Sequence, residues 1–348
     1  MNLKLARTHR IAVLRGDGIG PEVTESAVRV LEAVQKASRE LELSLIYGEA
    51  GHNCIERYGT NLPRQTLEML KQTEACLKGP MTTPEELGSP PSAAVTIRKV
   101  FDLYANIRPC KTLPNVPSLE PNIDLIVLRE NTEGLYIGRE FEITQGLGVA
   151  LRVITKRASE RIARLGFGLA SNRRKHVTAV HKRNILRVTD GIFRDAVFSV
   201  ATDFPNVQLD EVRVDAMAMR LIKEPERFDV IVTTNMFGDI ISDEAAQTVG
   251  GLGLAAGANI GDNYGMFEPV HGSVPKYAGQ NRANPIATIL AAKMMMDYLN
   301  EKEAAEMIEK AVMKVLEEGK VKTYDLGGRS TTNEVAEAIA EKILQLCS

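Results

Sequence analysis

The 348-residue sequence lacks the long apolar segments that mark membrane and secreted proteins. Its N-terminal residues contain no apolar stretch of about 7–15 residues followed by a cleavage site, so we expect no signal peptide. No run of about 18 apolar residues occurs anywhere, so we expect no membrane-spanning helix.

Cysteine and histidine are also scarce, which argues against a zinc site or a disulfide framework. The four cysteines, Cys54, Cys76, Cys110 and Cys347, are scattered and form no C-x-x-C pair. We therefore expect reduced, mostly buried thiols in a cytoplasmic protein. The five histidines show no ligand spacing either, so we expect most of them to be structural or surface residues.

Positive and negative side chains are nearly balanced, with a formal net charge of -2. This balance provides no overall attraction for nucleic acid or anionic membranes, so an anionic ligand must be met by a local cluster of arginine and lysine. The chain is 44% hydrophobic and 25% charged, which fits a sizeable core, and its length allows two domains or one large one.

Short apolar runs alternate with helical patterns, which predicts an α/β protein with a largely parallel sheet. The predicted strands are 11–15, 43–47, 123–129, 176–180, 207–214 and 228–234. The predicted helices are an amphipathic run from Pro21 to about Gln35, then 157–171, 189–201, 238–249 and 285–299. The proline-rich stretch 109–121 is a candidate connection between domains.

The glycine-rich loop GDGIG follows the first predicted strand. Its spacing is G-x-G-x-G, whereas the dinucleotide fingerprint requires G-x-G-x-x-G with an acidic residue about 20 positions later. Two interpretations remain open: a tight turn built on flexible glycines, or a phosphate-cradling loop of another kind.

A pair of aspartates marks one predicted helix, in the segment NMFGDIISDEAA. Asp239 and Asp243 are four residues apart, so their carboxylates share one face and repel each other unless a cation lies between them. A divalent cation with hard oxygen ligands fills this role, and a solvated acidic face is the alternative. The apolar neighbours at 236–237 and 240–241 favour a position near a buried surface. Asp215, at the end of a predicted strand, is a third candidate ligand.

Three arginines could bind a polycarboxylate through bidentate contacts, provided that their segments converge. Arg98 and Arg108 bound the segment RKVFDLYANIR, and Arg129 directly follows a predicted strand. Taken singly, each is more typical of a surface salt bridge. Lys182 comes soon after another strand and is a candidate general base or fixed charge, and Tyr136 is a candidate proton donor.

Six ordered segments together resemble one known family, the β-decarboxylating dehydrogenases, which includes isocitrate, homoisocitrate and 3-isopropylmalate dehydrogenases. The segments span almost the whole chain: GDGIGPEV, IRKVFDLYANIRP, RENTEGLY, HKRN, NMFGDIISD and EPVHGSVPKYAGQNRANP. The resemblance implies a two-domain, non-Rossmann α/β fold with the active-site cleft between the domains. A discontinuous large domain, 1–99 and 252–348, would carry the cofactor-binding loop. A small domain, 100–251, would carry the dimer contact and the metal-binding helix.

The resemblance also implies an activity, the metal-dependent oxidative decarboxylation of a 2-hydroxy acid with hydride transfer to a nicotinamide cofactor. Tyr136 would donate a proton to the enol intermediate, and Lys182 of the partner subunit would act in acid–base catalysis. Mg²⁺ or Mn²⁺ would be held by Asp239 and Asp243 with the partner's Asp215. The implied substrate-binding residues are Ser92, Arg98, Arg108, Arg129 and Asn184.

The segment HGSVPKYAGQNRANP bears on the choice of cofactor. NAD-using members typically have Asp-Ile after the first proline, whereas this chain has Lys276-Tyr277, as in NADP-using isocitrate dehydrogenases. An aspartate would repel the 2′-phosphate of NADP, while a lysine and a tyrosine hydroxyl would bind it. The implied cofactor-binding residues are His271, Gly272, Lys276, Tyr277, Asn284 and Tyr324.

Three further residues bear on the same choice. Tyr324 supports NADP, because NAD-using members commonly have proline at that position. Ala283 is more typical of NAD-using members, and Arg329 lies one position away from the arginine expected for NADP. NAD is therefore the alternative cofactor.

The expected substrate depends on the segment before Arg98. Ser92, six residues earlier, is typical of isocitrate-specific members and could help to hold a third carboxylate. Ala94 replaces a frequent asparagine and would leave room for the longer homoisocitrate. The pattern of 3-isopropylmalate enzymes is absent, because Pro91, Ala94 and Val95 occupy the places of an acidic residue and two leucines. The expected order is isocitrate, then homoisocitrate, then 3-isopropylmalate.

One residue departs from the family pattern. Arg183 stands between Lys182 and Asn184, where Ala or Gly is usual, and it would either alter the surroundings of the lysine or point away. A non-catalytic regulatory subunit is the alternative from another class, but the catalytic and metal-binding set is complete. We therefore expect a homodimer with shared active sites, or a higher oligomer, that acts on a small tricarboxylate.

Overall fold

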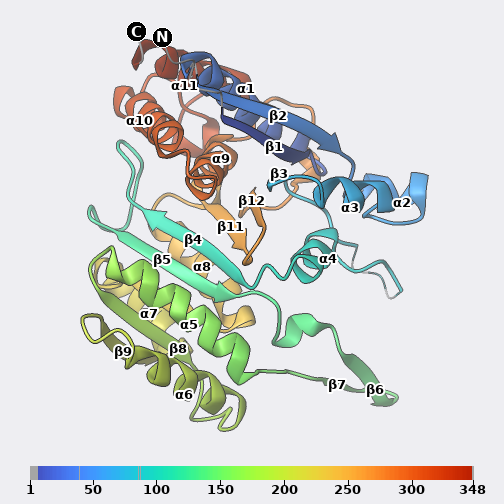
Figure 1. Cartoon of the computed structure of the whole chain (residues 1–348), viewed down its shortest axis with the longest axis vertical. Helices are drawn as coiled ribbons and strands as arrows, with labels where there is room; N and C mark the ends of the chain where they lie inside the picture. The colour runs from blue at the N-terminus through green and yellow to red at the C-terminus, as the bar shows by residue number, and fades with distance from the viewer. Residues whose placement is uncertain (1–6, 39, 85, 87, 347–348) are drawn as a thin grey trace.

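The computed structural model describes residues 7–38, 40–84, 86 and 88–346, and one ten-stranded sheet runs through it. Its strand order is β2-β1-β3-β12-β11-β4-β5-β10-β8-β9 (Figure 1). The strands of this sheet are β1 (Arg7–Leu14), β2 (Leu41–Gly48), β3 (Ala75–Lys78), β4 (Ala105–Lys111), β5 (Asp124–Glu130), β8 (His176–His181), β9 (Gln208–Arg213), β10 (Val230–Thr233), β11 (Ala256–Ile260) and β12 (Gly265–Pro269). A separate two-stranded ribbon pairs β6 (Glu140–Thr144) with β7 (Leu147–Ala150).

The helices are α1 (Gly20–Ala37), α2 (Asn53–Tyr58), α3 (Arg64–Leu70), α4 (Ala93–Val100), α5 (Lys156–Ser171), α6 (Thr189–Ala201), α7 (Val214–Lys223), α8 (Asn235–Thr248), α9 (Ile286–Tyr298), α10 (Lys302–Glu318) and α11 (Thr332–Leu346). Three short 3₁₀ turns bear on the site: η1 (Leu135–Ile137), η4 (Pro275–Tyr277) and η5 (Tyr324–Leu326). The five predicted helices are confirmed as α1, α5, α6, α8 and α9, with only small displacements at their ends.

The sheet is parallel on both flanks and antiparallel in the middle. The flanks β2-β1-β3-β12 and β5-β10-β8-β9 are parallel, whereas β12, β11, β4 and β5 pair antiparallel in succession. The prediction of a largely parallel sheet is therefore right for the flanks. It misses the antiparallel centre, since β11 and β12 have five residues each and such short strands give little periodicity.

The two ends of the chain share one hydrophobic core. Residues of α1, β1 and β3 pack there with residues of α9, α10 and α11, and both chain ends lie in the same half of Figure 1. The middle of the chain, from β4 to α8, forms separate cores around α5, α6 and α8. The fold thus has two bodies that share one sheet, and the domain boundaries stay a prediction.

One predicted strand is too long. β9 ends at Arg213 and α7 begins at Val214, so Asp215 lies in the first turn of a helix and not at a strand end. The reason is a change of period, because Met217 and Leu221 recur four residues apart and are both buried, as on a helix face.

The proline-rich stretch 109–121 is not a connection between the two bodies, contrary to the prediction. Pro109 lies within β4, and most of the stretch forms the loop from β4 to its antiparallel neighbour β5. Proline is tolerated there because the pairing of β4 with β11 ends at Ile107, which leaves that edge of β4 open.

The glycine-rich loop is a tight turn that holds neighbouring loops in place. Gly16 and Gly18 have φ angles of 74° and 59°, and a Cβ on Gly18 would lie 1.9 Å from the backbone oxygen of Ser273. The buried Asp17 carboxylate accepts a hydrogen bond from the backbone N–H of Thr82 at 2.9 Å. The contacts of the loop favour the tight-turn interpretation, with glycine required by the close approach.

The described cysteines are buried free thiols, as predicted. Burial raises the pKa of the Cys76 and Cys110 thiols to about 12, which keeps both protonated and unreactive. Cys347 lies outside the described residues. In the part of the chain that the structure describes, no helix is long and apolar enough to cross a membrane.

A cluster at the start of β1 predicts a pH-dependent contribution to stability. The His9 ring contacts Glu74 Oε2 at 2.9 Å and Glu301 Oε1 at 3.0 Å. Partial burial alone lowers the pKa of His9, but its hydrogen bonds to the two carboxylates outweigh this and raise the pKa above the ordinary value. This stabilisation is complete below the unfolded-state pKa and is lost as the pH rises through the folded-state pKa.

We therefore expect His9→Gln to lower the free energy of unfolding by about 1 kcal/mol at a pH of about 6, and by less at a pH of about 9. Urea unfolding of both proteins at the two pH values measures the difference. An equal loss of stability at both values would contradict the ion-pair account.

Candidate active site

Four elements bring two of the three predicted arginines, Tyr136 and the two aspartates to the middle of the sheet. Arg108 lies on β4 and Arg129 on β5, which are antiparallel neighbours, and α8 packs across both strands. Tyr136 lies on η1, which also contacts α8. The condition that the arginine segments converge is therefore met for these two arginines.

Asp239 is at the centre of this cluster. Its carboxylate forms ion pairs with Arg129 and Arg108, the latter at 3.2 Å, and accepts a hydrogen bond from the Tyr136 hydroxyl. Asp243, one turn further along α8, pairs with Arg108 at 2.8 Å. One guanidinium thus bridges both carboxylates, so they lie on the same side of the helix, as predicted.

Burial and charge act in opposite directions on these groups. Burial alone raises the pKa of Asp239, but Arg129, Tyr136 and Arg108 outweigh it and lower the pKa below the ordinary value. For Asp243 burial prevails over Arg108, and its pKa is raised. Burial and the hydrogen bond to Asp239 raise the pKa of Tyr136, so its hydroxyl keeps its proton at neutral pH. Burial lowers the pKa of Arg129 to about 10, which leaves it cationic.

The prediction that the aspartates lie near a buried surface is right in part, because only some of their apolar neighbours are buried. Ile241 is buried, but Met236 and Ile240 are 41% and 59% exposed. The side chains of Asp239 and Asp243 are themselves 35% and 51% exposed. The aspartates therefore lie at the border of the buried face of α8, where a ligand can reach them.

A second charged group contains the third predicted arginine. Arg98, on α4, pairs with Glu268 Oε1 at 2.9 Å, and the buried Lys78, at the end of β3, pairs with Glu268 Oε2 at 2.6 Å. Burial alone raises the pKa of Glu268, but the two cations outweigh it and hold the pKa far below the ordinary range. Arg98 is close enough to Asp239 for its charge to contribute to the lowered pKa of that carboxyl.

Two buried asparagines link the two charged groups. Asn259 Nδ2 donates to Glu268 Oε1 at 2.8 Å, and Asn259 Oδ1 accepts from Asn106 Nδ2 at 2.9 Å. Asn106 Oδ1 in turn accepts from Arg108 Nε at 2.8 Å. This chain of hydrogen bonds crosses β12, β11 and β4, so it fixes the cations of the two groups relative to each other.

One pocket combines predicted substrate and cofactor residues. Its lining includes Lys78, Ala94, Arg98, Arg108, Glu268, His271 and Gly272. Two buried nitrogen atoms of this lining, Arg98 Nε and His271 Nε2, have no hydrogen-bond partner among the described residues. Buried polar atoms are nearly always paired, so both atoms fit a polar ligand in the pocket. An apolar groove between α9, α10 and the end of α8 contains none of the predicted site residues.

The other predicted cofactor residues form a cluster of their own. The rings of Tyr277 and Tyr324 have centroids 6.0 Å apart, and Lys276 Nζ lies 4.8 Å from the Tyr277 centroid. Asn284 Nδ2 donates to Asp325 Oδ2 at 2.9 Å, which ties the same two segments together. The loop that contains η4 and the turn η5 therefore converge.

Lys182 and Asp215 pair with each other and not with the residues around Asp239. Lys182 Nζ lies 2.8 Å from Asp215 Oδ2, and this hydrogen bond lowers the pKa of Asp215. Within the described ranges, no group of three His, Cys, Asp or Glu residues could hold a metal ion. Asp239 and Asp243 are two carboxylates of the kind that a hard divalent cation binds. Asp215 of the same chain pairs with Lys182 and does not complete their set.

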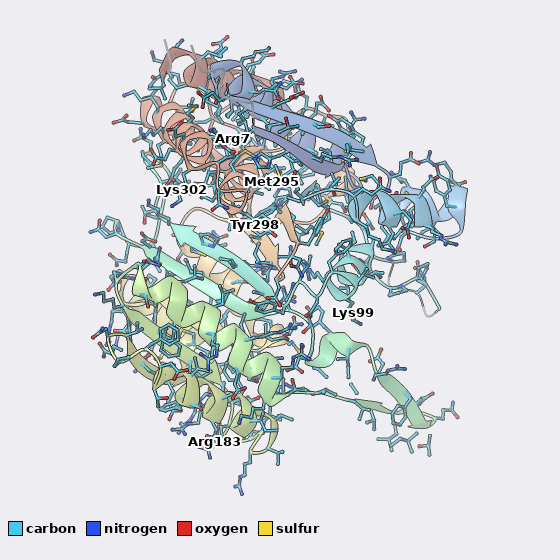
Figure 2. All side chains as sticks on the ribbon, in the orientation of Figure 1. Arg7, Lys99, Arg183, Met295, Tyr298 and Lys302 are labelled. Atoms are coloured by element: carbon cyan, nitrogen blue, oxygen red, sulfur yellow. The ribbon has the colours of Figure 1, made fainter. Side chains whose placement is uncertain are left out.

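The loop after β8 contains the remaining predicted residues. The fully buried Asp190 accepts a hydrogen bond from the Lys182 backbone N–H at 2.6 Å and pairs with Arg152 at 2.6 Å, so the backbone at Lys182 is fixed. Asn184 is exposed in this loop. Arg183 is also exposed and points outward at the edge of the molecule in Figure 2. Of the two alternatives for this residue, the structure therefore shows the second.

The segment before Arg98 borders the pocket. Ser92 directly precedes α4, and its side chain makes no capping hydrogen bond to the helix. Ala94 lines the pocket together with Arg98. Lys99 extends from α4 toward η1, with its Nζ 3.5 Å from the Ile137 oxygen, next to Tyr136 (Figure 2). The helix that bears on substrate choice thus contacts the turn that bears the candidate proton donor.

The sequence prediction missed four residues of this region. A signal was available for two of them, because Lys78 ends a fully buried strand and Glu268 opens the segment EPVHG on another buried strand. A charged residue in a buried strand needs partners of opposite charge, and a search of the sequence for such partners would have led to the pocket. Asn259 and Asp190 give no such signal, since only the packed structure shows their hydrogen bonds.

The comparisons with known proteins agree with this geometry. Residues 10–339 match the family described as isocitrate/isopropylmalate dehydrogenase. The chain is 48% identical over 338 residues to a 3-isopropylmalate dehydrogenase of Methanothermobacter thermautotrophicus, covering 97% of this chain and 99% of the relative. It is 49% identical over 340 residues to an isocitrate/homoisocitrate dehydrogenase of Thermus thermophilus, again covering 97% and 99%.

A solved structure shows the same fold. The isocitrate dehydrogenase of Methylococcus capsulatus superimposes with a TM-score of 0.92 at 42% identity, covering 97% of this chain and all of that one. The fold and the site define an α/β dehydrogenase. This chain belongs to the isocitrate/isopropylmalate dehydrogenase family. The relatives span several substrates, so membership alone leaves the substrate open.

Proposed function

We propose that this protein catalyses the metal-dependent oxidative decarboxylation of isocitrate, with NADP as the hydride acceptor. The observation that carries the proposal is the convergence of Arg108 and Arg129 on two accessible aspartates and Tyr136, with Arg98 close enough for its charge to act on Asp239. Three guanidinium groups suit a substrate with three carboxylates. Homoisocitrate is the second candidate, because it has the same carboxylates on a longer chain and Ala94 leaves space in the pocket lining. 3-Isopropylmalate is the third.

The residues have separate roles in this reaction. Asp239 and Asp243 would hold Mg²⁺ or Mn²⁺, and a cation bound there polarises the substrate oxygens and stabilises the developing enolate. Arg108 and Arg129, which neutralise the aspartates in this structure, would hold substrate carboxylates. Tyr136 keeps its proton at neutral pH and would donate it to the enol carbon.

We propose that the working unit is a homodimer in which Lys182 and Asp215 act in the site of the other copy. The pair lies outside the Asp239 cluster of its own chain, so each site lacks a base and a third ligand. Large apolar side chains are exposed on the β6–β7 ribbon, on α7 and on α8: Phe141, Ile143, Met219, Ile222, Met236 and Ile240.

The ribbon supports the same proposal. It extends away from the body in Figure 1, and nearly all its residues are exposed. An isolated two-stranded ribbon is marginally stable in water, and a large exposed apolar face usually marks a contact with another molecule. A second copy of the chain is the occupant that also completes the site. The active-site cleft would lie between a large domain, 1–99 with 252–348, and a small domain, 100–251. The buried free thiols suit a reducing, cytoplasmic compartment.

A crossed steady-state assay tests the proposed substrate and cofactor together. It compares kcat/KM for isocitrate, homoisocitrate and 3-isopropylmalate, each with NAD and with NADP, in the presence of Mn²⁺. We expect the highest value for isocitrate with NADP. A higher kcat/KM for homoisocitrate would show that Ser92 does not select isocitrate. No activity with any pair of substrate and cofactor would favour a non-catalytic regulatory subunit.

The cofactor preference is expected to depend on two adjacent side chains. Lys276→Asp with Tyr277→Ile would place a negative charge beside the 2′-phosphate of NADP and remove two of its binding groups. We expect the ratio of kcat/KM for NADP to that for NAD to fall by about 100-fold, since two charge-assisted contacts are lost. An unchanged ratio would show that these side chains do not bind the phosphate.

A further inference from the structure

One cation of the cofactor cluster is not among the predicted residues. The guanidinium carbon of Arg282 lies 4.3 Å from the ring centroid of Tyr324 and 5.2 Å from that of Tyr277. The two rings meet edge to face, with an interplanar angle of 70°. Arg282 therefore lies against both tyrosines, and cation–π contacts favour this position of its guanidinium.

The backbone on either side of Arg282 is fixed. The Asn281 oxygen accepts a hydrogen bond from the Thr332 N–H at 3.0 Å, and the Ala283 oxygen accepts one from the Thr332 hydroxyl at 2.6 Å. Ala283 is buried in a small apolar cluster with Ile19, next to the glycine-rich turn. A side chain on such a backbone, already held by two rings, loses less conformational freedom when it binds a ligand.

The charge of Arg282 is available to a ligand. Arg282 and Lys276 are both exposed, and in the described part of the chain no carboxylate forms an ion pair with either of them. An anion that binds between them displaces no existing ion pair. Two unpaired cations and two tyrosine hydroxyls thus make a cluster suited to an anion with several acceptor oxygens.

Gly328, the residue before Arg329 in the turn that follows η5, leaves no room for a side chain. A Cβ on Gly328 would lie 2.0 Å from the backbone oxygen of Lys322, so no side chain fits there unless the backbone moves. Arg282 approaches the same turn from the opposite segment, with its guanidinium against Tyr324. Arg282 therefore brings a guanidinium to both tyrosines from the loop that contains η4.

We propose that Arg282 binds the 2′-phosphate of NADP and is a determinant of cofactor specificity, acting with Lys276, Tyr277 and Tyr324. The inference rests on the proposed NADP preference and adds a residue to it. A guanidinium offers parallel N–H donors that match two phosphate oxygens, whereas the 2′-hydroxyl of NAD offers neither the charge nor the second acceptor. The contribution of Arg282 is therefore specific to NADP.

The test compares Arg282→Gln, Arg282→Lys and Arg329→Gln with the unaltered full-length protein. Steady-state assays give kcat/KM for NADP and for NAD, and calorimetry without substrate gives Kd for 2′,5′-ADP and for 5′-AMP. We expect Arg282→Gln to lower kcat/KM for NADP and affinity for 2′,5′-ADP by about 30-fold, with changes of about twofold or less for NAD and AMP. Arg282→Lys keeps the charge but not the planar fork, so its kcat/KM for NADP and its affinity for 2′,5′-ADP are expected to lie between those of the unaltered protein and of Arg282→Gln.

The outcomes separate this inference from the proposed function. If the unaltered protein prefers NADP and Arg282→Gln leaves the ratio unchanged, the role of Arg282 is overturned and the proposed function stands. If Arg329→Gln alone causes the loss, the phosphate contact belongs to Arg329 and the inference is again overturned. Equal losses for both cofactors would indicate a structural effect and contradict it. A preference of the unaltered protein for NAD would overturn the proposed cofactor and this inference together.

Discussion

Asp243→Asn is expected to lower metal-dependent turnover by about a thousandfold or more, because the bound cation supplies several kcal/mol of charge stabilisation. The amide is a weaker ligand for a hard cation and removes one of two negative charges. The fold is expected to survive, since Asp243 is 51% exposed and Arg108 retains Asp239 at 3.2 Å and Ser242 Oγ at 2.6 Å. Turnover over a series of Mn²⁺ concentrations, together with Mn²⁺ binding at equilibrium, measures the effect.

Glu244→Gln is the matched control for this variant. Glu244 is the next residue on α8, and among the described residues it forms no ion pair, although burial raises its pKa. The control removes the same charge from the same helix turn on a different face, so turnover is expected to stay near normal. Normal activity of Asp243→Asn would contradict the ligand assignment, and an equal loss in Glu244→Gln would show that the charge of the helix matters and not a particular ligand.

Two inactive variants are expected to restore activity when they share a dimer. Lys182→Met removes the proposed base, and Asp243→Asn removes a proposed metal ligand of the other half-site. In a mixed dimer one site combines the intact Asp243 of one copy with the intact Lys182 of the other. If subunits mix at random, half of the dimers are mixed and each has one intact site, so about one quarter of the normal activity should return.

The experiment co-refolds the two variants and measures turnover against each variant refolded alone. A mixture of Asp239→Asn with Asp243→Asn is the control, because both changes lie in the same half-site and no mixed dimer has an intact site. A Lys182→Met and Asp243→Asn mixture as inactive as its components would mean that each chain forms its own complete site. Restored activity in the control mixture would show that the substitutions do not fully inactivate the site.

Most strands of the flanks and five of their helices could be predicted because they repeat with a clear period, whereas β3, α10 and α11 were not predicted. α6 begins and ends at the predicted residues, and the strand β5 stands out by its four consecutive apolar residues, 125–128. The antiparallel centre was not predictable in the same way, because its pairing depends on strands far apart in the sequence, such as β4 with β11. The error at Asp215 has a local cause, since a strand and a helix meet there without a turn residue between them.

The site residues, too, could be predicted only in part from the sequence. Asp239 and Asp243 could be placed on one face from helical spacing alone, and their shared contact with Arg108 confirms that geometry. Their chemical role stays a prediction. Asn259 and Arg282 could not be found from the sequence, because their significance comes only from what they touch. An asparagine on a short strand and an exposed arginine in a loop are both ordinary until the pocket and the tyrosine pair are seen.

The measurement that tests the central claim most directly is the stoichiometry of the reaction. The protein would be supplied with isocitrate, NADP and Mn²⁺, and CO₂ and NADPH would be quantified in the same reaction, with a parallel sample containing EDTA. The account predicts equal amounts of CO₂ and NADPH and the loss of both with EDTA. Formation of NADPH without CO₂, or full activity after the metal is removed, would contradict metal-dependent oxidative decarboxylation at the Asp239–Asp243 site.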